Sequence, residues 1–487
     1  MKKSAVLASV AGVLLTGCSC VEADKCDAAP VQATVDFSKS IAEIKPLHGV
    51  NNSPVKLSQK NIPTFKEAGI PFCRLHDTAG AWGGTHYVDV PNIFPDFDAD
   101  PADPASYDFA FTDAYLKTLH GSGTEIFFRL GVTIENNYRI KAYNIYPPKD
   151  FNKWAEICAG IVRHYNEGWA NGFHFNIRYW EIWNEPENPP MWQGTKAQFF
   201  ELYRITANRL KKEFPQIKVG GYASCGFYAI NRPNPTPFYQ SFVTWFDDFL
   251  DYVKAPETAA PLDFYSWHLY TTDPDEIKLH SDYVAKKLRE KGFTNTENIF
   301  NEWNYVDKDP APEVRWVRMK NHYGASFVAA AFAVLQNSDT DKAMYYDALP
   351  TRAYCGLYEF PSMLTTATFD VFKYFNVLYK LGKQNPAAVS DDKVKILAAS
   401  DGKEAAVMLA NHTGEAKIVT LDSGDVKFSS CLITDANRRS ENIAFDGKIL
   451  LPPYSLAFLF TDGAQTAEGE KAEVQVNKNH AGLDGGN

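Results

Sequence analysis

The chain has 487 residues, of which 45% are hydrophobic, 14% aromatic and 22% charged, so it can bury a large core and wholesale disorder is excluded. At about 150 residues per domain, this length suggests about three domains. The formal net charge of −10 offers no basic excess to neutralise a phosphate backbone, which argues against nucleic acid as a partner.

The N-terminus has the layout of a secretory signal. Two lysines precede an apolar run, residues 5–15, that is too short to span a bilayer permanently. The run ends in Leu15-Thr16-Gly17-Cys18, which resembles the bacterial lipobox, where cleavage before the cysteine leaves a lipid-modified N-terminus. We therefore expect a signal peptide over residues 1–17, a lipid on Cys18, a tether over residues 18–32 and a location in the bacterial cell envelope.

The eight cysteines do not form a recognisable disulfide framework. Cys18 is assigned to lipid, and Cys20 and Cys26 lie in the tether. The other five are far apart in mostly apolar contexts and are expected to be buried free thiols: Cys73, Cys158, Cys225, Cys355 and Cys431. Neither C-x-x-C nor H-E-x-x-H occurs, so the sequence predicts no metal site and no cofactor.

Strand-like runs alternate with helical stretches between residues 46 and 348. Amphipathic helices are predicted over residues 151–166 and 195–214. The eight candidate strands are residues 47–51, 72–76, 125–131, 178–183, 218–223, 263–270, 298–303 and 343–347. This order predicts an α/β fold, the (β/α)₈ or TIM barrel, whose chemistry lies at the C-terminal ends of the strands. An open doubly wound sheet is the alternative, but no glycine-rich nucleotide loop supports it.

The pattern changes after a helical stretch at residues 369–381. Short apolar or alternating runs separated by turn residues follow, at residues 394–399, 405–411, 416–421, 429–435 and 455–460. They predict a C-terminal antiparallel β-sandwich over residues 381–462, after a barrel domain over residues 33–380. The strand-like stretch 33–37, within residues 33–45, is a candidate to pair with that sandwich. Residues 463–487 are polar and are expected to form a disordered tail.

Two strands deliver a glutamate at the predicted barrel mouth. The first ends in Trp183-Asn184-Glu185-Pro186-Glu187, where Pro186 cannot donate to a ladder and so ends the strand beside Glu185. The second ends in Asn301-Glu302-Trp303-Asn304. Paired carboxylates about 5 to 5.5 Å apart are what a retaining glycosidase uses. One attacks the sugar, and the other, whose pKa we expect burial and the ionised partner to raise, donates a proton.

The segment W-x-I-W-N-E-P-E, with Met191-Trp192, Phe200-x-Leu-Tyr203 and Lys218-Val-Gly-Gly221 after it, resembles family 39 of the glycoside hydrolases, in clan A of retaining (β/α)₈ enzymes. The resemblance covers roughly residues 45–380, and the predicted sandwich matches the family's plan. It implies that Glu185 is the general acid/base, Glu302 the nucleophile and Asn184 the donor to the sugar 2-hydroxyl. Asn301-Glu302-Trp303-Asn304 departs from the family's more common Thr-Glu-Phe-Asn, which weakens any statement about substrate.

Further candidates follow from their positions at strand ends. Arg74 and His76 resemble the clan's cationic rim group, in which Arg74 would support the nucleophile and His76 would contact the sugar. Alternation places His268 and Tyr270 on one face of a strand, and the resemblance implies that they bind a sugar hydroxyl and hold the nucleophile, respectively. Weaker sugar-binding candidates are His48, Asp347 and, as a stacking surface, Trp192.

Together these features predict a retaining exo-glycosidase acting on plant-type oligosaccharides, with β-xylosidase activity favoured. An α-L-arabinosidase or iduronidase-like enzyme of the same mechanism is the alternative within this chemistry. A catalytically silent sugar-binding surface lipoprotein is the alternative from another class. The expected partners are an oligosaccharide or glycoside substrate and the membrane, reached through the N-terminal lipid.

Overall fold

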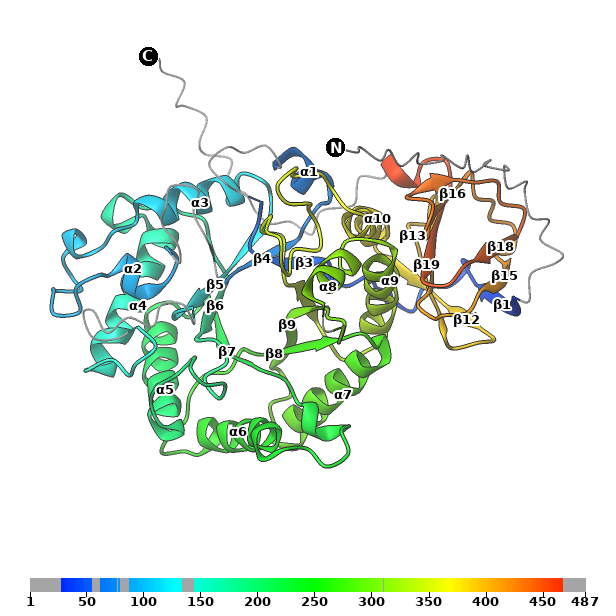
Figure 1. Ribbon diagram of the computed structural model, residues 1–487. Coiled ribbons are helices and arrows are strands. Elements are labelled where there is room, and N and C mark those ends of the chain that lie inside the picture. The colour runs from blue at the N-terminus through cyan, green and yellow to red at the C-terminus, as the bar shows by residue number, and fades with distance from the viewer. Residues whose placement is uncertain are drawn as a thin grey trace, which may run out of the picture.

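The computed structural model describes residues 28–54, 62–76, 78, 87–133, 144–309 and 311–466. Cys18, the expected signal peptide and residues 467–487 of the expected tail lie outside these ranges. Figure 1 shows a barrel beside a smaller unit of strands, with helices α9 (His322–Gln336) and α10 (Ala367–Leu381) between them. Both helices contact strands of the smaller unit, so the two parts share packed surface.

The barrel is closed and parallel, which confirms the predicted fold class. In the described part of the chain its strands follow one another in the order β10, β3, β4, β5, β6, β7, β8, β9. Their bounds are β3 (Gly49–Asn51), β4 (Phe72–Leu75), β5 (Glu125–Leu130), β6 (Tyr179–Ile182), β7 (Lys218–Ser224), β8 (Phe264–Thr271), β9 (Glu297–Tyr305) and β10 (Lys342–Tyr345). Each of the eight predicted strands therefore corresponds to a barrel strand.

Helices surround the barrel and begin at recognisable caps. The Asp150 side chain accepts from the amide of Asn152 to start α4 (Phe151–Glu167), and Thr195 and Gln198 form a capping box at α5 (Lys196–Glu213). The remaining helices are α1 (Ile62–Glu67), α2 (Val90–Ile93), α3 (Ala110–His120), α6 (Pro237–Lys254), α7 (Pro274–Glu290) and α8 (Pro312–Arg318). Among the helices that the structure describes, none is both long enough and apolar enough to cross a membrane.

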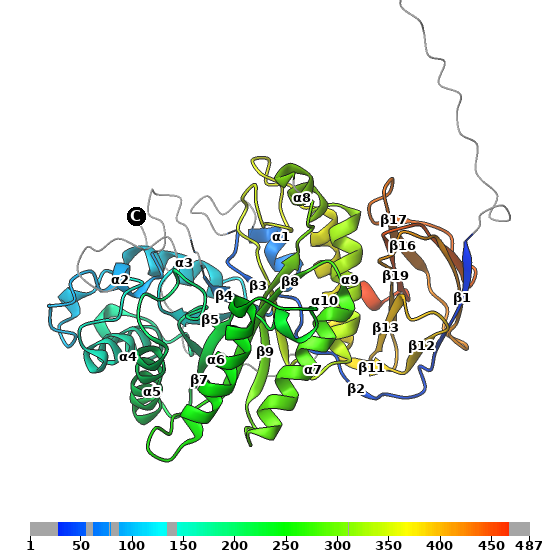
Figure 2. The ribbon, with the colours of Figure 1, turned by 60° about the horizontal axis from the view of Figure 1, so that its bottom comes forward.

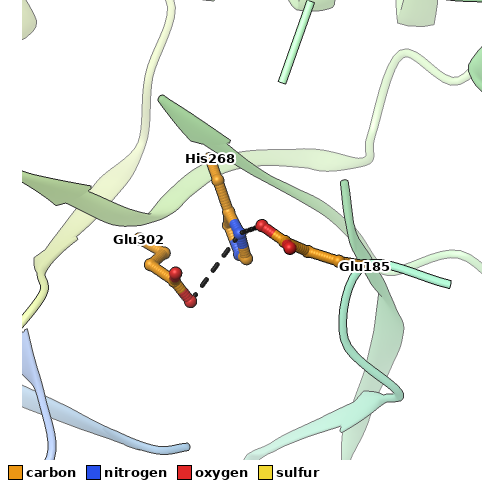
Figure 3. Close-up of side chains that lie close together, drawn as sticks. All are labelled: Glu185, His268 and Glu302. Atoms are coloured by element: carbon orange, nitrogen blue, oxygen red, sulfur yellow. Dashed lines mark hydrogen bonds and ion pairs between the residues drawn. The ribbon is translucent and has the colours of Figure 1, made fainter. Parts of the chain in front are cut away.

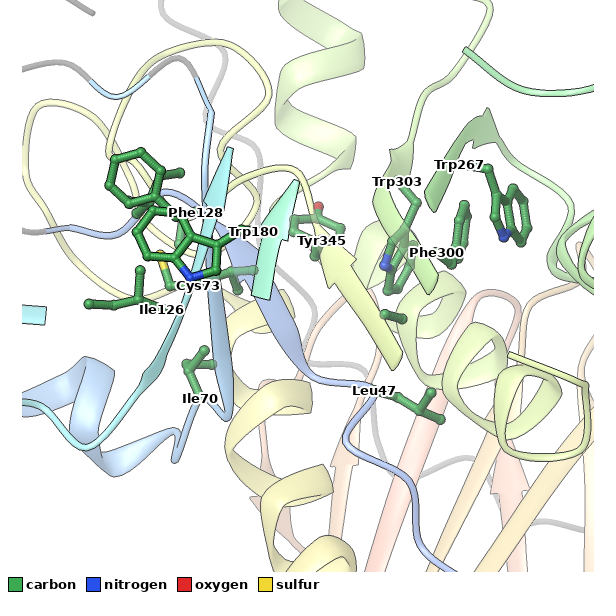
Figure 4. Close-up of a cluster of buried hydrophobic side chains, with 14 of the residues drawn as sticks. Leu47, Ile70, Cys73, Ile126, Phe128, Trp180, Trp267, Phe300, Trp303 and Tyr345 are labelled. Atoms are coloured by element: carbon green, nitrogen blue, oxygen red, sulfur yellow. The ribbon is translucent and has the colours of Figure 1, made fainter. Parts of the chain in front are cut away.

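Large aromatic side chains fill the space between the barrel and its helices. Figure 4 shows Phe128 and Trp180 side by side on β5 and β6, where their ring centroids are 5.0 Å apart. On the other side of the barrel, Trp267 stacks on Phe300 at 4.2 Å. Burying one such side chain contributes about 2–3 kcal/mol. The aromatic content of the sequence thus serves mainly to build this core.

The barrel interior is layered. Its floor is apolar and consists of Phe72, Phe127, Tyr179, Phe264, Ile299 and Met344. Phe127 on β5 and Phe264 on β8 lie on strands that are not neighbours, yet their ring centroids are 5.1 Å apart, which places both inside the barrel. Because side chains alternate along a strand, the residues two positions further on form the next layer. That layer is polar and contains Arg74, Glu181, Ser266 and Asn301.

The smaller unit is a sandwich of two sheets, ordered β12-β1-β15-β18 and β17-β16-β19-β14-β13-β11-β2 among the described residues. Val31, Val35, Val407 and Leu409 are among the apolar side chains buried in its core. The bounds are β1 (Ala29–Val35), β2 (Ala42–Glu43), β11 (Lys383–Asn385), β12 (Ala387–Val389), β13 (Val394–Ser400), β14 (Ala405–Asn411), β15 (Lys417–Asp422), β16 (Ser430–Thr434), β17 (Glu441–Asn442), β18 (Lys448–Leu451) and β19 (Ser455–Phe460).

Strand β1 corrects two expectations. It begins at Ala29, inside the stretch expected to be tether, because Val31, Ala33 and Val35 alternate with exposed residues and bury one apolar face. It also pairs parallel with β15, so the sandwich is not wholly antiparallel. In Figure 2 β1 lies on the side of the sandwich that is remote from the barrel. At the other end of the chain, residues 464–466 form a short 3₁₀ turn with Ala464 buried, so ordered structure extends into the expected tail.

Candidate active site

A β-bulge turns Glu302 into the barrel. Simple alternation from the inward-facing Ile299 would point Asn301 and Trp303 inward and Glu302 outward. The register between β8 and β9 shifts, however: Trp267 pairs with Phe300, whereas His268 pairs with Glu302. The extra residue lets Asn301 and Glu302 both face the interior. Trp303 faces outward and packs on Phe327 and Phe332 of α9.

Left-handed backbone at the end of β6 places Glu185. Trp183 and Glu185 have φ angles of 72° and 44°, a conformation that costs non-glycine residues about 1–3 kcal/mol. Trp183 turns away from the barrel interior and packs on Trp154 and Trp192. The Glu185 amide donates to the carbonyl of Ala223 at 3.0 Å, which ties this turn to β7. Glu185 thereby reaches the mouth, where its side chain is 6% exposed.

Glu185 and Glu302 face each other across His268, as Figure 3 shows. His268 Nδ1 lies 2.7 Å from Glu185 Oε1 and 3.7 Å from Glu302 Oε2. One ligand atom from each of the three side chains lies within 4.8 Å of the other two. The two carboxylates, from strands separated by about 120 residues of sequence, therefore meet in one small space.

Glu302 is held by two donors. The Tyr270 hydroxyl donates to Oε1 at 2.6 Å, and Arg74 Nη1 donates to Oε2 at 3.0 Å. His76 Nε2 lies 4.0 Å from Oε2. Arg74 and Tyr270 thus hold the Glu302 carboxylate, as predicted, and with His76 they leave it little rotational freedom.

Arg74 also organises the polar layer below the mouth. Its Nε donates to Glu181 Oε2 at 2.6 Å and its Nη2 to Asn184 Oδ1 at 2.7 Å. Glu181 in turn accepts from Ser266 at 2.6 Å and Asn301 at 2.5 Å. Burial lowers the pKa of the Arg74 guanidinium, but Glu181 and Glu302 raise it by more. The net shift is upward, so Arg74 keeps its positive charge.

Sequence reasoning missed three residues of this site. Glu181 lies two positions after the inward-facing Tyr179, so strand alternation would have found it. Asn51 accepts from Arg74 Nη1 at 3.0 Å and ends β3, which was a second available signal. Asn188 donates to Glu185 Oε2 at 2.9 Å from the loop after β6, and no periodicity marks it.

The ionisation of Glu185 differs from our expectation of a raised pKa. Burial does raise the pKa of this carboxyl, but hydrogen bonds from His268, Asn188 and Cys225 lower it by more. The same pairing acts on His268, where burial lowers the pKa of the imidazole and the Glu302 and Glu185 carboxylates raise it by more. Both shifts favour the charged forms of the pair, the Glu185 carboxylate and the His268 imidazolium.

Two candidates lie outside the barrel interior, which corrects their prediction as sugar ligands. His48 is buried beneath α10, where its Nε2 lies 3.1 Å from the Gly69 carbonyl and its ring packs on Phe375. Burial lowers the pKa of His48 to about 3. Trp192 is 4% exposed and packs on Trp183, so no ring face is open to a sugar.

Asp347 lies beside the barrel mouth between β10 and β3. Its Oδ2 accepts from Asn52 Nδ2 at 3.1 Å. Its role as a sugar ligand stays a prediction. The cysteines that the structure describes, Cys73, Cys158, Cys225, Cys355 and Cys431, are free thiols, as expected, but Cys225 is half-buried rather than buried.

Glu187 is a buried carboxyl near Glu185. Its Oε1 accepts from the Ser224 hydroxyl and the Cys225 amide, both at 2.8 Å, whereas its Oε2 has no hydrogen-bond partner among the described residues. Burial raises the pKa of Glu187 from 4.5 to about 7. As the pH rises, the unfolded chain releases this proton first, so the stability linked to it is present below pH 4.5 and lost by about pH 7.

Glu187→Gln should therefore raise the free energy of unfolding at pH 8 by up to about 3 kcal/mol and change it little at pH 4.5. Glutamine keeps the shape and the two accepted hydrogen bonds but cannot ionise. Urea unfolding at both pH values measures the difference. Glu313→Gln, at a side chain that is 68% exposed, is the matched control and should show no such pH dependence. An equal effect of Glu187→Gln at the two pH values would contradict the linkage.

Glu185, His268 and Glu302 also have the spacing of a metal site. The fit is poor, because Arg74 already places a buried positive charge 3.0 Å from Glu302 and Tyr270 donates to the other oxygen. A second cation would be repelled by the guanidinium. The donor set is better suited to acid–base chemistry.

A (β/α)₈ barrel with two facing glutamates at the ends of its fourth and seventh strands has the architecture of a retaining glycoside hydrolase. The family model described as "Glycosyl hydrolases family 39" matches residues 95–346, more than half of the chain. The chain belongs to glycoside hydrolase family 39.

Among curated proteins, a β-xylosidase of Geobacillus stearothermophilus is 27% identical over 297 residues, covering 54% of this chain and 53% of that enzyme. An α-1,4-L-rhamnosidase of Formosa agariphila is 24% identical over 209 residues, covering 43% of this chain and 38% of that enzyme. The chain thus matches about half, or less, of these relatives' length.

Solved structures share the fold. A glucosidase from Croceicoccus marinus superposes with a TM-score of 0.71 at 21% identity, covering 89% of this chain and 98% of that one. A monomeric β-xylosidase from Caulobacter crescentus gives 0.61 at 16% identity, covering 88% and 99%. These matches include the sandwich as well as the barrel.

Proposed function

We propose that this chain is a retaining exo-glycosidase that cleaves plant-type oligosaccharides by double displacement, with β-xylosides as its substrates. The observation that carries the proposal is the Glu185–Glu302 pair, two facing carboxylates with separate sets of donors. Their separation suits a mechanism in which one carboxylate attacks directly, without room for an intervening water. The β-xylosidase from Geobacillus stearothermophilus supports the choice of substrate.

In the first step Glu302 attacks the anomeric carbon, the glycosidic C–O bond breaks, and the leaving oxygen takes a proton from Glu185. In the second step Glu185 removes a proton from water, whose oxygen attacks the same carbon and releases Glu302. Arg74 and Tyr270 orient the Glu302 carboxylate for the attack. Each step inverts the anomeric centre, so the product keeps the configuration of the substrate.

His268 supplies the proton that Glu185 needs. Its Nδ1 lies 2.7 Å from Glu185 Oε1, and transfer of the proton gives a neutral pair, which a site emptied of water by substrate favours. After the transfer His268 keeps a proton on Nε2, which has no protein partner within the described ranges. The same is true of Asn184 Nδ2, since the Asn184 oxygen is engaged by Arg74. Both groups are available as donors to sugar hydroxyls, Asn184 to the 2-hydroxyl.

Proton NMR of the first product formed from an aryl β-xyloside tests the mechanism. We expect the β-anomer to appear first and the α-anomer only by later mutarotation. If the α-anomer appears first, the double-displacement mechanism is wrong.

A panel of nitrophenyl glycosides tests the substrate separately. The panel contains β-xyloside, β-glucoside, α-L-arabinoside, α-L-rhamnoside and α-L-iduronide. We expect kcat/KM for the xyloside to exceed the others by about tenfold or more, since a pocket discriminates by about 10–200-fold against one added group. A higher kcat/KM for another glycoside would contradict β-xylosides as the substrates but would not contradict the double-displacement mechanism. Binding of xylo-oligosaccharides without release of sugar from any member would favour the silent receptor.

We also propose that the chain is anchored in the bacterial cell envelope by a lipid on Cys18. The support is the sequence Leu15-Thr16-Gly17-Cys18 after a short apolar run. Cells expressing the full chain should incorporate labelled palmitate into it, and cells expressing Cys18→Ser should not. Equal labelling of the two chains would contradict the anchor.

A further inference from the structure

Aromatic rings lead from the catalytic pair to the surface of the barrel mouth. The Tyr354 ring lies 6.0 Å from Tyr270, which holds Glu302, and 5.7 Å from Tyr346. On its other side Tyr354 packs on Trp316 of α8 with ring centroids 4.7 Å apart. Tyr346 continues the row to His76 at 6.3 Å. These rings are therefore continuous with the residues that surround the nucleophile.

Tyr354 is exposed to solvent and lies beside Tyr270, the residue that holds Glu302. Tyr354 is 38% exposed. Burial of the rest of the residue raises the pKa of the phenol; Arg315 lowers it, and the charges of Glu302 and Glu185 raise it further. Trp316, next outward, is half-buried.

The position of Tyr354 is set by β9 itself. Its carbonyl accepts from Asn304 Nδ2 at 2.8 Å, and Asn304 is two residues after Glu302 on the same strand. The Tyr354 carbonyl also accepts from the Asp347 amide at 3.2 Å. On the outer side Arg315 lies over the Trp316 ring at 5.5 Å and donates to the Asp309 carbonyl. Both rings are thus pre-positioned relative to the nucleophile.

We propose that Tyr354 and Trp316, here called the platform, form a binding site for the leaving-group sugar of a neutral oligosaccharide. Aromatic faces bind flat apolar surfaces, and a pyranose presents such a surface through its C–H groups. Of the side chains around Glu302, Arg74 and His76 are buried and Tyr270 is half-buried, so the sugar to be cleaved lies inside the mouth. The sugar that contacts the exposed platform is then the leaving-group sugar. This inference rests on the proposed function.

The test compares two substrates that differ in their leaving group. Xylotriose presents a leaving disaccharide, whereas β-xylosyl fluoride has a leaving group of one atom. In Tyr354→Ala and Trp316→Ala, the ratio of kcat/KM for xylotriose to that for the fluoride should fall about tenfold. Tyr354→Phe keeps the ring and should keep the ratio. Phe111→Ala, at an exposed aromatic side chain on α3, is the matched control and should also keep it. An unchanged ratio in both alanine variants overturns the platform.

A binding measurement separates failure of the platform from failure of the proposed function. In the Glu302→Gln background, where no xylotriose is cleaved, calorimetric titration should give a Kd about tenfold weaker when Tyr354→Ala is added. If the wild type releases no sugar from either substrate, the proposed function is wrong. The titration alone then decides whether the platform binds xylotriose. An equal Kd with and without Tyr354→Ala overturns it, whatever the activity.

Discussion

Glu302→Gly is expected to lower kcat/KM for nitrophenyl β-xyloside by at least about 10⁴-fold, as loss of a covalent nucleophile does in other enzymes. Azide should restore cleavage, because removal of the side chain leaves room on the face of the sugar from which Glu302 attacks. Azide then displaces the leaving group in one step and gives α-xylosyl azide, with inverted configuration. Product analysis by NMR, with rates measured over a range of azide concentrations, provides the measurement.

The fold of this variant is expected to survive, since Arg74 keeps the Glu181 carboxylate at 2.6 Å after Glu302 is gone. Glu302→Gln is the matched variant: its side chain fills the same space, so we expect the same loss of activity and no rescue. A folded Glu302→Gly chain that azide cannot rescue, or a product of retained configuration, would contradict the assignment of Glu302 as nucleophile.

Glu185→Ala is expected to lower kcat/KM strongly for substrates whose leaving group needs a proton and much less for those whose leaving group does not. Xylobiose, whose leaving alcohol needs a proton, should lose about 10²–10⁴-fold in kcat/KM, the range of general acid catalysis. Dinitrophenyl β-xyloside, whose leaving group needs none, should lose far less in the first step and accumulate the glycosyl-enzyme intermediate. Azide should then attack that intermediate from the side vacated by Glu185 and give β-xylosyl azide, with retained configuration. Steady-state rates with both substrates and NMR of the azide product test this.

The two azide products give this pair of variants its discriminating power. Opposite configurations assign Glu302 and Glu185 to opposite faces of the sugar, which loss of activity alone does not show. Equal losses for xylobiose and the dinitrophenyl substrate in Glu185→Ala would point to a general defect in binding or folding. His268→Gln offers a useful comparison, because it removes the 2.7 Å contact to Glu185 while both carboxylates remain.

The fold was largely predictable because its elements are local. The apolar runs that became β5 and β6, and the 3.6-residue periodicity of α4 and α5, depend on neighbours within a few residues. The short sandwich strands β11, β12, β17 and β18 escaped prediction, since two to four residues carry too little pattern. The parallel pairing of β1 with β15 places Ala29 opposite Lys417, almost 400 residues apart in sequence. No local sequence pattern predicts this pairing.

The candidate site was predictable where residues end strands. Arg74, His268, Tyr270 and Glu302 lie in the C-terminal halves of barrel strands and Glu185 just follows one, and the closed barrel brings these parts together. His48 and Trp192 failed this rule for different reasons. His48 precedes β3 and points outward beneath α10, whereas Trp192 lies near Glu185 in sequence but fills the gap between Trp183 and Phe199. Proximity along the chain did not decide access to the site.

By itself, the sequence determined that two barrel strands carry a glutamate toward their C-terminal side, because the apolar runs of the strands and the proline after Glu185 are local features of the chain. Only the tertiary structure decided that these carboxylates face each other. A bulge in β9, defined by its pairing with β8, turns Glu302 inward, and left-handed backbone after β6 does the same for Glu185. It also decided the direction in which the pKa of Glu185 shifts, since that pKa depends on His268, 83 residues away in sequence and 2.7 Å away in space. Register and electrostatics are sums over contacts between distant segments, and those contacts exist only once the barrel has closed.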